Sequence, residues 1–125
     1  MKHLSANKVF SCYPLVKIAI IDIKMGDQNC IEAIQSAQPA IFPRQACIFA
    51  SIGRDGMENP IIIDDDNRMM MGGCRLRYAI EMEYDSIDAI VVNDEEEIKK
   101  IQKEFVKSEF KLIPEKYVYK HILDF

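Results

Sequence analysis

The sequence GGCRLR, residues 72–77, combines two glycines with a thiol and two guanidinium groups. Glycine has no side chain, so the backbone can turn sharply there and approach a ligand closely. A helix that begins directly after such a turn directs its first N–H groups and the positive end of its dipole toward a phosphate. Arg75 and Arg77 add forked donors that match phosphate oxygens. They point about 200° apart on an α-helix, so only one of them is expected to reach a ligand.

Cys74 gives the same turn a second interpretation. The start of a helix and neighbouring arginines stabilise a thiolate, which is the nucleophilic form of cysteine. The residues therefore allow either a phosphate site with an incidental cysteine or a thiol-based active site. A third interpretation assigns no ligand at all, because a glycine pair followed by arginines is by itself a weak motif.

The composition indicates one folded domain over residues 1–125. The chain is 49% hydrophobic and 29% charged, and its 125 residues leave no room for a second domain of ordinary size. Its 20 acidic and 16 basic residues give a net charge of −4, which argues against nucleic acids and anionic membranes as partners. No apolar run approaches the roughly 20 residues of a membrane span, and the N-terminus lacks the apolar core of a secretory signal. We therefore expect a cytoplasmic protein.

The residues that commonly bind metals form no pattern that indicates a site. The four cysteines are scattered without a C-x-x-C pair, so we expect Cys12, Cys30 and Cys47 to pack as small hydrophobic side chains. Residues 64–66 are three adjacent aspartates. They suit a turn better than a cation site, because consecutive side chains point in different directions. We assign no metal ligand.

Before the glycine pair, local patterns predict one strand and two helices. Residues 14–23 form a branched apolar run that is typical of a core strand. Asn29 offers an N-cap, with a glutamate three residues later, and predicts a short helix. Pro43 suits the first turn of the next helix, and Gly53 and Gly56 can end it.

The second of these helices carries polar residues at regular spacing. Arg44, Cys47 and Ser51 lie at i, i+3 and i+7, so they share one face. The apolar face of the same helix carries Ile48 and Ile52. The polar face could be the solvent side of a surface helix, or it could contribute to a site.

The glycine pair itself lies between predicted strands. Residues 60–63 and 68–71 predict a hairpin, and residues 87–93 predict another buried strand. Asn93 or Asp94 is expected to cap a long helix, with three glutamates in its first turn. The apolar stripe of this helix is formed by Ile98, Ile101 and Phe105.

The core is expected to span about residues 14–107. Residues 108–125 form a C-terminal tail rich in aromatic side chains. Such a tail is expected to pack on the domain, on a second copy of the chain or on a protein partner.

Residues 49–94 together resemble the ParB/sulfiredoxin superfamily. The shared pattern is a helix that ends in Ser-Ile, a glycine-containing turn that leads to Asn-Pro-Ile-Ile, a hairpin, a Gly-x-x-Arg box that opens a helix, and then a strand. The resemblance covers roughly residues 14–94 and is weaker before Arg44. It implies an α+β fold of a stand-alone ParB N-terminal type: a small single domain with a mixed β-sheet packed with helices.

The resemblance assigns the box glycine to Gly72 and its arginine to Arg75. In this register Gly73 takes the position of the sulfiredoxin nucleophilic cysteine, and Cys74 lines the pocket without being the nucleophile. A rival register aligns the Gly73-Cys74 pair with the Gly-Cys of sulfiredoxin, but it puts Leu76 where the phosphate-binding arginine belongs. We prefer the first register.

The resemblance also gives the polar face of the upstream helix a role. Sulfiredoxins carry Lys, Ser and Thr at this spacing, where the present sequence has Arg44, Cys47 and Ser51. Arg44 would then supply a cation and Ser51 a hydroxyl donor to the nucleotide pocket, with Arg77 as a further cation.

The function that the resemblance implies is the binding of a nucleoside di- or triphosphate, ATP or CTP, with magnesium. Hydrolysis or phosphoryl transfer is the leading reaction class, and the mechanism would rest on positioning and charge stabilisation. The general base stays unassigned, since Asp22, Asp55 and Glu58 are candidates that no spacing distinguishes.

Three alternatives stay open. The chain could be a non-enzymatic adaptor with a vestigial or regulatory nucleotide pocket, a ParB-like nuclease or DNA-binding protein, or a sulfiredoxin-like reductase. The reductase requires Cys74 to be the nucleophile. Against DNA partition, only about 30 residues follow Asp94, too few for the helix-turn-helix and dimerisation regions of a chromosome-partition ParB protein.

Overall fold

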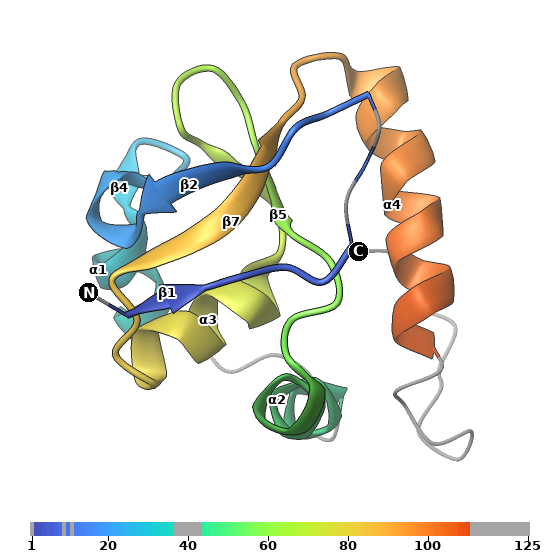
Figure 1. Cartoon of the computed structure of the whole chain (residues 1–125). Coiled ribbons are helices and arrows are strands. Elements are labelled where there is room, and N and C mark those ends of the chain that lie inside the picture. The colour runs from blue at the N-terminus through green and yellow to red at the C-terminus, as the bar shows by residue number, and fades with distance from the viewer. Residues whose placement is uncertain (1, 9, 11, 37–43, 111–125) are drawn as a thin grey trace.

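The computed structural model describes residues 2–8, 10, 12–36 and 44–110, and it has the α+β architecture that the sequence predicts (Figure 1). A mixed sheet contains β1, β2, β5, β6 and β7, while β3 and β4 form a separate hairpin. In chain order the elements are β1 (His3–Leu4), β2 (Val16–Ala19), the 3-10 turn η1 (Ile20–Asp22), β3 (Lys24–Met25), β4 (Gln28–Asn29), α1 (Cys30–Ser36), α2 (Arg44–Asp55), β5 (Ile61–Ile63), β6 (Met69–Met71), α3 (Gly73–Glu81), β7 (Ser86–Val91) and α4 (Glu95–Phe110).

Strand β7 is the centre of the sheet. It pairs in parallel with β1 and β5 and antiparallel with β2. β6 extends the sheet by antiparallel pairing with β5. Four of the six residues of β7 are buried, because strands lie along both of its edges and helices cover both faces of the sheet.

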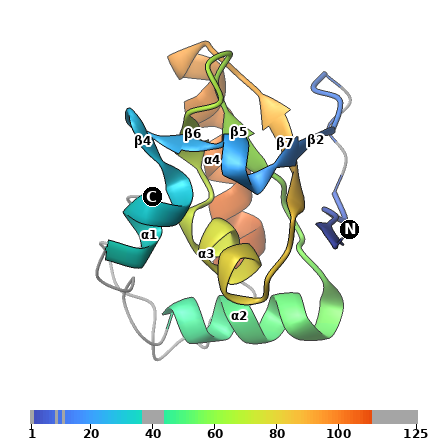
Figure 2. The same ribbon diagram turned by 90° about the vertical axis from the view of Figure 1, so that its left-hand side faces the viewer.

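Two apolar cores hold the helices against the sheet. On one face α1, α2 and α3 pack with Ile61 and Ile63 of β5, and on the other face α4 packs with Ile62. Consecutive residues of β5 therefore serve opposite cores, as the alternation of side chains along a strand requires. Figures 1 and 2 show the consequence, with α1 and α4 on opposite sides of the molecule.

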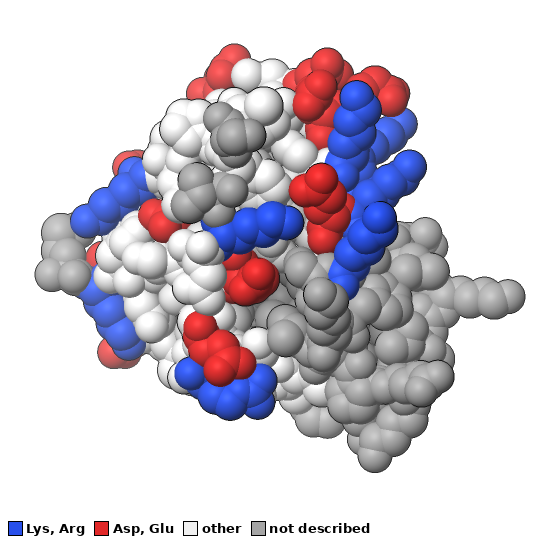
Figure 3. Space-filling view, turned by 45° about the vertical axis from the view of Figure 1, so that its right-hand side comes forward, with Lys and Arg blue, Asp and Glu red and all other residues white. Residues whose placement is uncertain are grey.

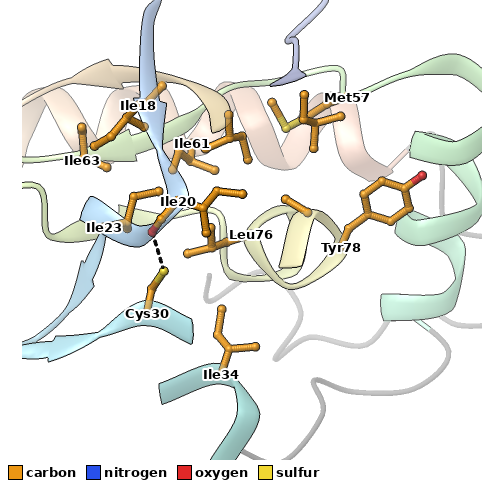
Figure 4. Close-up of a cluster of buried hydrophobic side chains, with 14 of the residues drawn as sticks. Ile18, Ile20, Ile23, Cys30, Ile34, Met57, Ile61, Ile63, Leu76 and Tyr78 are labelled. Atoms are coloured by element: carbon orange, nitrogen blue, oxygen red, sulfur yellow. Dashed lines mark hydrogen bonds between the residues drawn. The ribbon is translucent and has the colours of Figure 1, made fainter. Parts of the chain in front are cut away.

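The larger core is built around Leu76, which is fully buried (Figure 4). At its edge Cys30 donates its thiol hydrogen to the Ile20 carbonyl over 3.2 Å. Burial raises the pKa of the Cys30 thiol to about 11, so the group stays protonated at neutral pH and packs as a small hydrophobic side chain, as expected. The same expectation is wrong for Cys12, which is exposed.

The start of α1, the end of α2 and the start of α4 confirm capping residues that the sequence predicts. The side-chain oxygen of Asn29 accepts the Ile31 N–H at 3.0 Å and starts α1. Gly56, with φ of +86°, ends α2 in a conformation that glycine adopts without strain. Of the two candidate caps for α4, Asp94 has this role, because its carboxylate accepts the Glu96 N–H at 2.9 Å.

The strand expected at residues 14–23 is shorter than predicted. Only Val16–Ala19 pair with β7, and the chain then forms η1. The Ile20 N–H donates to the carbonyl of Asp85 at 3.0 Å, and Ile21 is 69% exposed, so the chain leaves the sheet after β2. The apolar run does not reveal this bend, because Ile21 has the same side chain as its buried neighbours.

The C-terminal boundary also differs, because α4 continues to Phe110 beyond the expected limit at residue 107. The predicted packing of the aromatic tail falls on residues 111–125, which lie outside the described residues. Within the described residues, no helix has the length and apolar character needed to cross a membrane.

The N-terminal strand β1 was not predicted, and a histidine fixes it to β7. The ring of His3 lies 2.7 Å from the Ser86 hydroxyl through Nδ1 and 2.7 Å from the Asp88 carboxylate through Nε2. The second carboxylate oxygen of Asp88 accepts the N–H of Ala6 at 2.9 Å. Two side chains of β7 thus hold the first residues of the chain in register.

We expect His3→Ala to lower the free energy of unfolding by about 1–3 kcal/mol. The substitution removes the partner of Ser86, which is 2% exposed, and of the half-buried Asp88. Urea denaturation measures the change, with Lys24→Ala on the exposed side of β3 as a control that should stay within about 0.5 kcal/mol of the parent. Parental stability of His3→Ala would show that the histidine is not needed for the pairing of β1.

Candidate functional site

Gly72, at the N-cap of α3, is the residue on which the glycine turn depends. Its backbone has φ of 118° and ψ of 29°, a left-handed conformation. A Cβ at this position would lie 2.6 Å from Cγ2 and 2.9 Å from Cβ of Ile61. Both the conformation and the packing against β5 therefore require glycine.

The start of α3 carries no side-chain cap. Gly72 makes no side-chain hydrogen bond to the helix, and no acidic residue lies in the first turn. Gly73, the first helical residue, is exposed. Because the first N–H groups of a helix have no acceptor within it, this backbone and the positive end of the dipole can attract an anion.

The start of α4 shows the contrasting arrangement. Asp94 caps it, and Glu95, Glu96 and Glu97 fill its first turn. Carboxylates of the chain already compensate the dipole there. The three glutamates that the sequence places in this first turn therefore have a structural explanation. On the face shown in Figure 3, acidic and basic side chains lie interspersed. On α4, for example, the Lys99 ammonium lies 3.8 Å from the Glu96 carboxylate.

Arg75 lies in the interior rather than on the surface. Its side chain is 5% exposed, and its guanidinium carbon lies 5.1 Å from the centroid of the Phe105 ring. This cation–π contact joins the first turn of α3 to α4. The expected cation is thus present at the turn, and it packs on an aromatic face.

Arg77 points in a different direction, as its spacing predicts. It donates to the carbonyl of Ile34 in α1 at 3.2 Å, and it lies 3.8 Å from Glu81, one turn further along α3. These contacts lie along α3 toward its C-terminal end. Cys74 is half-buried and packs against the larger core.

The upstream helix α2 is present as predicted and continues through Gly53 to Asp55, but the described residues of its polar face do not form a solvent face. Ser51 is 6% exposed and Cys47 is half-buried. The side chain of Arg44 lies outside the described part of the chain. α2 packs on α3 through an edge-to-face contact of Phe49 with Tyr78, whose ring centroids are 5.4 Å apart.

The three carboxylates considered as a general base are all exposed. Asp55 pairs with its neighbour Arg54 at 2.9 Å. Asp22 lies in η1, and Glu58 precedes β5. No contact with the turn at residues 72–75 distinguishes any of the three in the described structure.

The aspartates at residues 64–66 form a turn, as expected. The Asp64 carboxylate accepts the N–H groups of Asp66 and Arg68, both at 2.9 Å. Asn93, two residues after β7, makes two further hydrogen bonds with Asp65, both of 2.9 Å. Its side-chain oxygen accepts the Asp65 N–H, and its amide donates to the Asp65 carboxylate. Among the described residues, no group of three or more His, Cys, Asp or Glu side chains is placed to hold a metal ion.

The cluster of His3, Ser86 and Asp88 is one that the motifs did not indicate. These residue types occur in hydrolase triads, but Ser86 is 2% exposed, so a substrate cannot reach its hydroxyl. We assign the cluster a structural role. The available signal was the aspartate within the apolar strand at residues 86–91, since a carboxylate in a buried strand requires a partner.

Comparison with known proteins gives a limited result. No family model and no curated protein matches the sequence. Among solved structures, the C2221 form of a pNOB8-like ParB N-domain covers 72% of this chain with a TM-score of 0.45 and 16% identity. A second structure of a pNOB8-like ParB N-domain covers 72% with a TM-score of 0.44 and 17% identity. The chain spans about a third of the length of these two proteins, 34% and 32%.

Substitutions at the two glycines should have different effects on stability. We expect Gly72→Ala to lower the free energy of unfolding by at least about 2 kcal/mol, because it combines a left-handed backbone with overpacking against Ile61. Gly73→Ala is the matched control. Its Cβ would meet only the Met69 side chain at 3.9 Å, so stability should stay the same or rise slightly. Thermal or urea unfolding measures both, and equal losses would contradict the role given to Gly72.

Proposed function

We propose that this chain binds a nucleoside di- or triphosphate, ATP or CTP, at the turn formed by residues 72–75. The observation that carries the proposal is the start of α3. There a glycine that tolerates no side chain opens a helix without a capping side chain or an acidic first turn. An anion is the ligand that such a helix end attracts.

Two features of the chain support phosphate as that anion. Gly73 is exposed, so the first turn of α3 is accessible there, while Gly72 packs against Ile61. The guanidinium of Arg75 adds positive charge beside the turn, and its burial lets the charge act through a medium of low dielectric constant. The resemblance to the ParB/sulfiredoxin superfamily adds Ser51 and Arg44 on α2 as further donors in this proposal, with Arg77 as a more distant cation.

Magnesium would be bound chiefly through the phosphate oxygens, as is usual for nucleotide sites. The reaction class that we favour is hydrolysis or phosphoryl transfer, in which backbone amides and Arg75 position the phosphates and stabilise developing charge. A non-enzymatic role in which the nucleotide regulates binding of a protein partner is the second candidate. A turnover assay on nucleotide-bound protein separates the two.

Gly73→Glu provides a test that separates binding from folding. A carboxylate in the first turn of α3 should raise the free energy of unfolding by about 0.3–1 kcal/mol, because it interacts favourably with the helix dipole. The same carboxylate should repel phosphate and weaken nucleotide binding by about tenfold or more, or about 1.4 kcal/mol. Calorimetric titration with ATP, ADP, CTP and GTP, each with and without magnesium, measures the effect.

Gly73→Ala is the neutral control and should bind as the parent does. If Gly73→Glu binds nucleotide as tightly as Gly73→Ala, the phosphates do not lie at this helix end. If the parent binds none of the four nucleotides, the proposed function is wrong.

Arg75→Met tests the contribution of the buried cation. Methionine fills most of the same volume against Phe105, so the packing of α4 on α3 should be largely preserved. We expect nucleotide binding to weaken by about tenfold, or about 1.4 kcal/mol, because the positive charge beside the turn is lost. Unchanged binding would remove Arg75 from the site and overturn the register that places the box arginine there.

A further inference from the structure

We draw no further inference here: the strongest candidate, the apolar hollow of about 450 Å³ that Ile80 of α3, Ile31 of α1 and Ile20 of η1 line, carries none, because nothing in the described part of the chain shows what covers it.

Discussion

Strand β7 is buried on both faces and hydrogen-bonded along both edges, and the remaining elements take their positions from it. Its inner residues divide between two cores, with Ile87 and Ala89 facing α1, α2 and α3, and Ile90 facing α4. A strand with this environment tolerates few polar side chains. Its two exceptions, Ser86 and Asp88, are both bonded to His3, so the polar groups of β7 specify how the chain begins.

Local signals in the sequence were sufficient to predict most elements, because the interactions behind them are local. Asn29 and Asp94 bond to N–H groups two residues away, and Gly56 ends a helix through its own backbone. The apolar spacing of Ile98, Ile101 and Phe105 likewise predicts the buried face of α4. Each of these signals can be recognised without knowing the rest of the fold.

Features that depend on distant residues could not be predicted in the same way. The pairing of β1 requires residues more than 80 positions away, and a two-residue strand has no pattern of its own. The bend after Ala19 depends on the carbonyl of Asp85. In the candidate site, the sequence predicts the glycine turn and the diverging arginines, but not that Arg75 stacks on Phe105. That contact joins two helices whose relative position only the fold determines.

The position of β7 in the chain also has a consequence for the order of folding. Each of its partners β1, β2 and β5 precedes it, and β1 is separated from it by 83 residues. During synthesis these segments leave the ribosome before the strand that must pair with all of them. Loop closure over such distances is slow compared with local helix formation. Strand β1 therefore stays unpaired until β7 has been made.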